Sequence, residues 1–248
     1  MTYHARYQAG EHIGVWRELT ALGASVRAPA LIDDAWAVAE ETMTRVASNI
    51  DRIIERLANC SFKFDVYPDG TMPSASLPAH GRPDGALLAD VVELEQRVGP
   101  IPLSLRAFWQ VVGTVSLIGR GPEGWPDYSD PLFISPPGYA LIELLERGSG
   151  EESERTFMCG LAPDVLHKDN VSGGAEYAIA LPNSSADATF EEEWRGIGFV
   201  PYLRVAILEW GGFPGLSHDS PQDKWRRKYP SAPPPVWFGE LTQDLLPF

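Results

Sequence analysis

A seven-residue repeat of apolar side chains runs through residues 36–57 and constrains the fold more than any other feature of the sequence. The repeat has spacings of three and four residues in alternation and consists of Trp36, Ala39, Met43, Val46, Ile50, Ile53 and Leu57. This spacing is typical of a long helix that buries one continuous stripe. The stripe packs either against the rest of the chain or against the same helix of a second copy, so a monomer and a homodimer are both open.

The composition is that of a globular chain with a hydrophobic core. The chain has 248 residues, of which 44% are hydrophobic, and this is too apolar for a disordered protein. Its first residues lack the apolar core of a signal peptide, and no stretch approaches the roughly 18 apolar residues of a membrane-spanning helix. Cys60 and Cys159 form neither a zinc motif nor a redox pair. We therefore expect a cytoplasmic protein that is not inserted in a membrane.

The charge of the chain favours some partners over others. The 34 acidic and 20 basic side chains give a net charge of −14, which repels phosphate backbones, argues against nucleic-acid binding and favours a basic protein partner. We predict that the partner-binding surface contains the acidic runs and two tryptophans in polar stretches: Glu151, Glu152, Glu154, Glu191, Glu192, Glu193, Trp194 and Trp125. The basic cluster at residues 224–228 either pairs with these runs or faces a partner.

The order of the predicted elements indicates an α+β fold. A helix over residues 13–22, with Ile13, Trp16, Leu19 and Leu22 on its apolar face, is expected to pack against the long helix as an N-terminal hairpin. Helices over 87–98 and 101–112 follow, and short strands mixed with helices come after them. This order predicts a mixed, mainly antiparallel sheet of short strands flanked by helices.

Composition also divides the chain into segments. We predict an N-terminal helical hairpin extension over 1–66, a Pro/Gly-rich connecting loop over 67–85 and an α+β domain over 86–216. The tail, residues 217–248, is rich in proline and aromatic residues. It is expected to wrap the surface and to dock Trp237 and Phe238.

One polar cluster offers catalytic chemistry. Residues 165–167 are predicted as a strand, and His167 and Asp169 lie at its end. A histidine beside an acid can act as a general base. A hydrolase-type enzyme that uses His167 and Asp169 is therefore one alternative, and an ordinary polar loop between two strands is the other.

The sequence predicts neither a cofactor nor a metal. Residues 119–124 match G-x-G-x-x-G, but Pro122 and Pro126 exclude the helix that a dinucleotide site requires, so a loop is expected there. The five histidines lack the spacing of helical metal ligands.

A pattern of structural residues surrounds the helix over 101–112. An apolar residue and a proline, Ile101 and Pro102, open it, Phe108 lies at its centre, and Gly113 ends it before a strand. This pattern resembles the motif of the SMI1/KNR4 family, of the SUKH superfamily. The acidic helix upstream and the short strands downstream fit as well, whereas Thr114 follows Gly113 where the family usually has Asn-Gly.

The resemblance implies a sheet flanked by helices and no enzymatic activity. Many bacterial members look like immunity proteins that neutralise a cognate toxin, often a nuclease, and fungal members are regulatory hubs. An acidic chain suits a basic nuclease because complementary fields speed their encounter. The resemblance thus predicts a non-enzymatic protein-binding module, an immunity protein against a basic toxin. The alternatives are the hydrolase and a scaffold or regulatory assembly protein that dimerises through the 36–57 helix.

Overall fold

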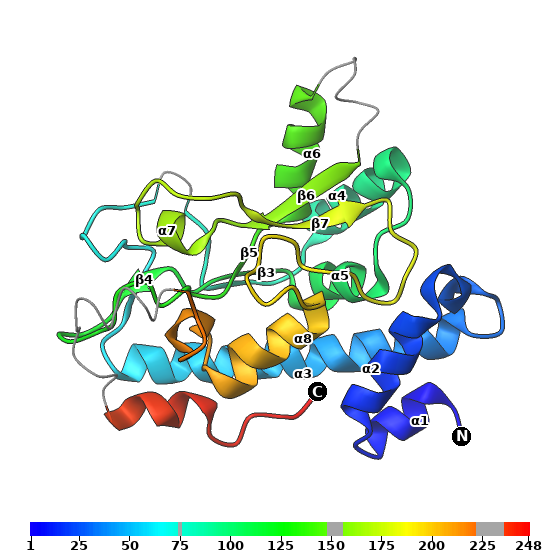
Figure 1. Ribbon diagram of the computed structural model, residues 1–248, viewed down its shortest axis with the longest axis horizontal. Helices are drawn as coiled ribbons and strands as arrows, with labels where there is room; N and C mark the ends of the chain where they lie inside the picture. Colours follow the sequence, from blue (N-terminus) through cyan, green and yellow to red (C-terminus); the bar gives the residue numbers. More distant parts are fainter. Residues whose placement is uncertain (74–75, 148–155, 222–235) are drawn as a thin grey trace.

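The computed structural model describes residues 1–73, 76–147, 156–221 and 236–248. Helices make up just under half of the described residues, and small antiparallel sheets lie above the longest helix (Figure 1). The predicted α+β fold with an N-terminal helical hairpin is therefore confirmed. Within these ranges, no helix has both the length and the apolar character needed to cross a bilayer.

The heptad segment forms α3 (Ile32–Asn59), a helix that runs across the lower half of the molecule in Figure 1, above α1 and the C-terminal tail. It packs against α1, α5 and η2 of the same chain. Its apolar stripe is buried by these contacts, and Met43, Ile50 and Leu57 have no exposed surface. The scaffold alternative needed this stripe as a dimer interface. That prediction is wrong, because the chain itself already covers the stripe.

The hairpin is built from short helices that pack on α3. They are α1 (Tyr3–Gln8), α2 (His12–Ala21) and the 3₁₀ helix η1 (Gly23–Arg27). Trp16 of α2 donates a hydrogen bond to the Thr42 hydroxyl of α3 at 2.9 Å. The predicted apolar face is wrong at Ile13, which is 69% exposed. Val15 is buried in its place, because it lies one helical turn before Leu19 on the face toward the core.

Three small antiparallel sheets form the second layer. The first pairs β1 (Lys63–Phe64) with β4 (Gly119–Arg120). The second has the order β2 (His80–Gly81), β3 (Thr114–Ser116), β5 (Phe133–Ile134). The third pairs β6 (Phe157–Ala162) with β7 (Tyr177–Leu181). The remaining helices are α4 (Gly85–Val98), α5 (Leu103–Ala107), η2 (Phe108–Val112), α6 (Pro137–Glu146), α7 (Val165–Lys168), α8 (Phe199–Arg204), η3 (Val205–Glu209), η4 (Pro214–Leu216) and η5 (Val236–Thr242).

The residues of the family-like pattern have structural roles. Ile101 and Phe108 are fully buried, and Pro102 precedes α5 as its N-cap residue. The predicted single helix is α5 followed by one π-helical turn, η2. Gly113 ends η2 with φ of +93°, a conformation that favours glycine. One cluster of buried apolar side chains joins α3 to the helices and strands after residue 85.

The tail docks along α3, as Figure 1 shows. Phe238, Leu241 and Phe248 are buried there, whereas the side chain of Trp237 lies outside the described part of the chain. A polar stripe on α3 holds the main chain of this segment. The side chains of this stripe donate hydrogen bonds to main-chain carbonyl oxygens of residues 240–247. They belong to Arg45, Asn49, Arg52 and Arg56.

Candidate functional site

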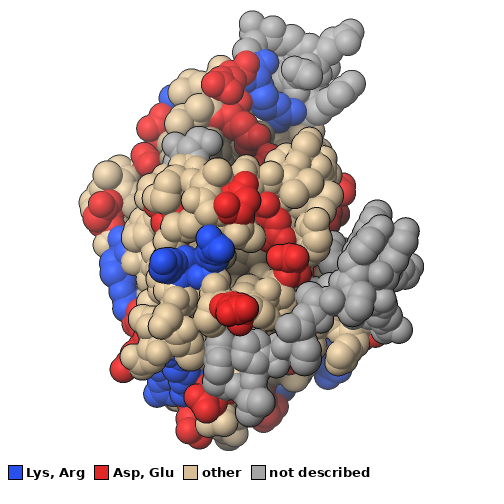
Figure 2. Space-filling view, turned by 90° about the vertical axis from the view of Figure 1, so that its left-hand side faces the viewer, with Lys and Arg blue, Asp and Glu red and all other residues tan. Residues whose placement is uncertain are grey.

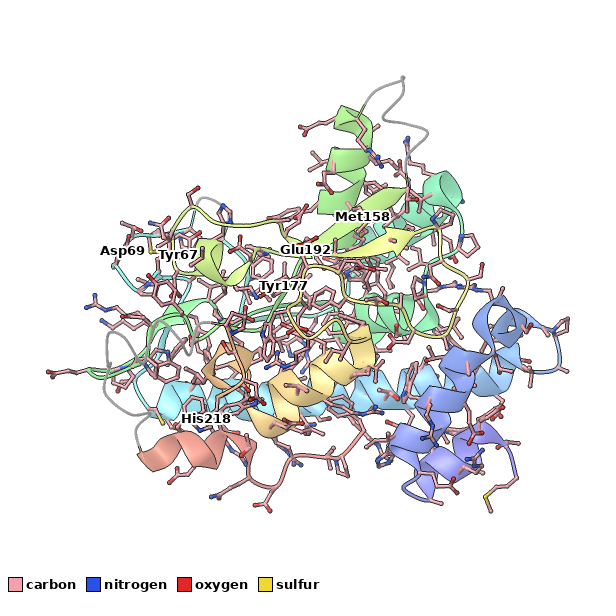
Figure 3. All side chains as sticks on the ribbon, viewed as in Figure 1. Tyr67, Asp69, Met158, Tyr177, Glu192 and His218 are labelled. Carbon is pink, nitrogen blue, oxygen red and sulfur yellow. The ribbon has the colours of Figure 1, made fainter. Side chains whose placement is uncertain are left out.

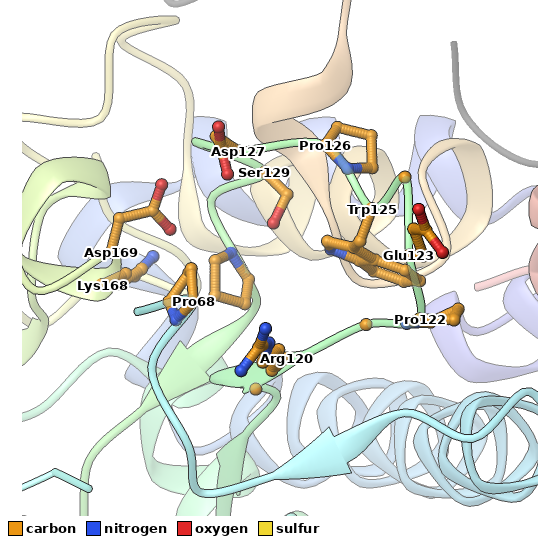
Figure 4. A pocket seen from close by; sticks show the side chains of 14 residues that line it. Pro68, Arg120, Pro122, Glu123, Trp125, Pro126, Asp127, Ser129, Lys168 and Asp169 are labelled. Carbon is orange, nitrogen blue, oxygen red and sulfur yellow. The ribbon is translucent and has the colours of Figure 1, made fainter. Parts of the chain in front are cut away.

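A pocket of about 500 Å³ opens beside β4 and the loop that follows it. Figure 4 shows Lys168 and Asp169 on one side of the pocket and Trp125 on the other, with Arg120 below them. The loop is the G-x-G-x-x-G segment together with residues 125–131, and no helix is described in it. The pocket therefore combines a carboxyl group, a guanidinium and an aromatic side chain.

Lys168 is committed to the fold and not to a ligand. Its Nζ donates to Oδ1 of Asp130 at 2.6 Å, and both side chains are buried. The Tyr177 hydroxyl donates to the second oxygen of Asp130 at 3.2 Å, and Nζ lies 4.7 Å from the centre of the Tyr177 ring. Such a buried pair persists because each charge is met by hydrogen-bond partners.

Asp169 is the titratable group of the pocket. Burial raises the pKa of its carboxyl group to about 7, although a hydrogen bond from the Tyr128 main-chain N–H works in the opposite direction. Figure 2 shows this end of the molecule, where acidic and basic side chains lie near one another. A carboxyl group with this pKa can donate or accept a proton near neutral pH.

The structure does not bring His167 and Asp169 together. His167 is exposed, hydrogen-bonded through Nδ1 to the Asp164 carboxylate, and it lines a second hollow, of about 660 Å³, with Tyr67 and Asn170. The predicted strand is instead α7, which Asp164 caps by accepting from the Leu166 N–H. Residues two apart share one side of a strand, but in a helix they point in nearly opposite directions. The expected catalytic pair is therefore divided between two hollows.

Sequence reasoning missed a pair of carboxylates, Glu143 and Glu176, which line a third hollow beside the second one. Glu176 and Pro163 line both the second hollow and the third one, of about 220 Å³, whose walls include Tyr139 and Glu143. Partial burial and the neighbouring Glu143 carboxylate raise the pKa of Glu176 to about 7. A Cβ on Gly160 would lie 2.3 Å from the Glu176 carboxyl group, so this carboxyl group covers the bare backbone of β6. No spacing in the sequence links residues 143 and 176.

The predicted contact surface at residues 191–194 needs correction. Glu193 is buried, and both carboxylate oxygens are used by Arg195, one by the guanidinium at 2.6 Å and one by the main-chain N–H at 2.9 Å. Trp194 is half-buried beneath the same guanidinium, which lies 3.9 Å from its ring. Glu191 pairs through its main chain with Ala178. Glu192 is exposed (Figure 3) and Glu191 is partly exposed, so these two side chains of the run, and not that of Glu193, can face a partner.

The other members of the predicted contact set are placed differently. Trp125 was expected at an exposed surface but is half-buried, with ring centres of Phe62 and Phe213 both 4.9 Å from its own. It belongs to an aromatic cluster that also contains Phe238. Glu151, Glu152 and Glu154 lie outside the described residues, as does the basic cluster at 224–228.

Two further observations complete the description of the site. Among the described residues, no group of three or more histidine, cysteine, aspartate or glutamate side chains is arranged to hold a metal ion. Comparison of the chain with protein-family models, with curated proteins and with solved structures gives no match.

Proposed function

We propose that the chain is a non-enzymatic protein-binding protein of the SMI1/KNR4 type, an immunity protein that neutralises a basic toxin. The family-like pattern supports this proposal through its residues. Ile101 and Phe108 are core residues, Pro102 opens the helix and Gly113 ends it. A basic nuclease is the toxin class that an acidic surface suits best.

The observation that carries the proposal is that many arginine side chains bind main-chain carbonyl oxygens. Six of them donate to main-chain carbonyl oxygens: Arg27, Arg45, Arg52, Arg56, Arg195 and Arg204. In the described part of the chain, Arg52 and Arg56 form no ion pair with a carboxylate. Carbonyl groups carry no net charge, so arginines that bind only carbonyl oxygens leave carboxylates elsewhere without a cationic partner. The chain has 34 acidic and only 20 basic side chains, so unpaired carboxylates remain for a basic partner.

The geometry also favours binding over catalysis. His167 and Asp169 face different hollows, and Asp169 already accepts a hydrogen bond from the main chain. A general base needs its acid partner or nucleophile within hydrogen-bond reach.

Co-expression tests the proposal. Each basic protein encoded by a neighbouring gene is expressed alone and together with the full chain, and growth is measured. We expect one of them to arrest growth alone, to be harmless with the chain, and to co-purify with it at low salt and less at high salt, because salt screens charge pairs. If no neighbour-encoded basic protein is toxic or bound, the proposal is wrong.

A further inference from the structure

Helix α6 (Pro137–Glu146) projects from the body of the molecule in Figure 1 and leaves large apolar side chains uncovered. Tyr139, Ile142 and Leu145 are 40%, 56% and 62% exposed. Because they follow one another at intervals of three residues, they form one continuous ridge on the helix. Met158, on β6 below α6 (Figure 3), is 41% exposed as well. A contiguous apolar surface of this kind marks an interaction site.

An acidic ridge runs beside the apolar one. Glu143 and Glu146 lie four residues after Tyr139 and Ile142, respectively, and so flank them on the helix surface. Glu143 meets the Glu176 carboxyl group beside the helix. Within the described ranges, none of these three carboxylates forms an ion pair with a lysine or arginine.

Arg147 is the described basic residue that lies nearest in the sequence to these carboxylates, and it forms none of the ion pairs described with them. Its guanidinium lies over the Phe157 ring, 5.4 Å from the ring centre. Tyr139, Glu143, Gly160 and Glu176 all line the third hollow, of about 220 Å³. A planar guanidinium suits such a place, because it stacks on an aromatic ring and bonds two carboxylate oxygens at once.

We infer that the outward face of α6, together with the adjoining carboxylates of Glu143 and Glu176, is the surface on which the basic partner docks. The inference rests on the proposed function and names its site. The occupant is a protein surface whose apolar side chains cover the Tyr139–Ile142–Leu145 ridge and whose arginine or lysine enters the third hollow and binds the two carboxylates. Charge complementarity selects this partner over an acidic or a purely apolar one.

A defined probe tests the surface with the full chain. The probe is a fluorescent amphipathic helix of about 18 residues made of leucine and arginine, and its counterpart carries glutamate in place of arginine. We expect the arginine peptide to bind and to slow amide hydrogen exchange in α6 and β6, and the glutamate peptide not to bind. If the arginine peptide fails to bind, or protects other elements instead, the inference is wrong.

Matched variants decide between a specific site and general attraction to an acidic protein. The test variants are Ile142→Ser/Leu145→Ser and Glu143→Gln/Glu176→Gln. The controls, at exposed positions on α2 and α3, are Ile13→Ser and Glu40→Gln/Glu55→Gln. We expect each test variant to weaken peptide binding about tenfold, with the controls within about twofold of the unmodified chain. Equal losses in test and control variants would overturn the inference.

The two proposals can fail separately. If a neighbour-encoded toxin is neutralised equally by the unmodified chain and by Ile142→Ser/Leu145→Ser, the proposed function stands and this surface is wrong. If no toxin is neutralised although the peptide binds α6 with the expected variant pattern, the surface remains a site for basic partners and the immunity function is wrong.

Discussion

Asn49 of α3 and Leu246 of the tail are hydrogen-bonded in both directions across 197 positions of the sequence. The Asn49 side chain donates to the Leu246 carbonyl oxygen and accepts from the Leu246 N–H, each at 2.8 Å. Asn49 is fully buried. The side-chain amide of Asn49 thus pairs with both main-chain polar groups of Leu246, as a neighbouring strand would, and fixes the position of the tail along α3.

We expect Asn49→Ala to destabilise the protein by about 2–4 kcal/mol, because it leaves a donor and an acceptor of the tail unpaired and opens a cavity. Urea unfolding followed by far-UV circular dichroism measures the change. Ser48→Ala removes an exposed hydroxyl one residue earlier and should change stability by less than about 0.5 kcal/mol. Similar losses in the two variants would show that the tail is not held by Asn49.

Gly113 gives a second test of stability. Its φ is +93°, and a Cβ there would lie 2.1 Å from the Gly81 carbonyl oxygen. Gly113→Ala should therefore cost about 3 kcal/mol or more. Gly14 is the matched control, since it lies inside α2 with no atom within 4 Å of an added Cβ. Gly14→Ala should raise the free energy of unfolding by about 0.5–1 kcal/mol. Thermal melts of both variants check the contrast, and a neutral Gly113→Ala would contradict it.

The sequence predicts individual helices and their buried faces better than it predicts which segments pack against those faces. Apolar periodicity shows which face of α3 is buried, because burial acts on every turn of the helix. It does not show what covers that face, since α5, η2 and a second copy of the helix all satisfy the same pattern. The stripe at Arg45, Asn49, Arg52 and Arg56 has helical spacing too, yet a polar stripe is usually solvated, so nothing in the sequence indicates that the tail docks on it.

The candidate site is less predictable, since it depends on contacts between distant segments. Glu143 and Glu176 meet only because α6 packs on β6 and β6 pairs with β7. Glu193 is acidic in an acidic run, but Arg195 folds back on it and buries it. The interpretation of residues 165–167 as a strand was wrong because a four-residue helix has too few residues to show a period.

Asp169 predicts a pH dependence. Its folded-state pKa, about 7, lies above its ordinary value of 3.8, so the protonated carboxyl favours the folded state. This contribution is complete below about pH 4 and is lost as the pH rises through about 7. Asp169→Asn keeps an acceptor for the Tyr128 N–H but cannot ionise. We expect it to match the unmodified chain near pH 4 and to be more stable by about 2 kcal/mol near pH 8.

Urea unfolding at several pH values measures this difference. Glu123→Gln, at an exposed position in the same pocket, serves as the control and should show no comparable trend. A constant difference between Asp169→Asn and the unmodified chain from pH 4 to pH 8 would mean that Asp169 ionises without cost, contrary to its burial.

The buried ion pair of Lys168 and Asp130 is expected to couple the effects of substitutions at the two positions on stability. Lys168→Met leaves the Asp130 carboxylate in the interior with only the Tyr177 hydroxyl, 3.2 Å away, as a described hydrogen-bond donor. Removing one member of such a pair costs about 3–5 kcal/mol. Asp130 has φ of +52°, which asparagine tolerates, so Asp130→Asn is the suitable second change. In Lys168→Met/Asp130→Asn no charge remains buried, and we expect the double variant to be more stable than Lys168→Met alone. A double-mutant cycle of urea unfolding measures this coupling, and strictly additive losses would show that the two charges do not stabilise one another.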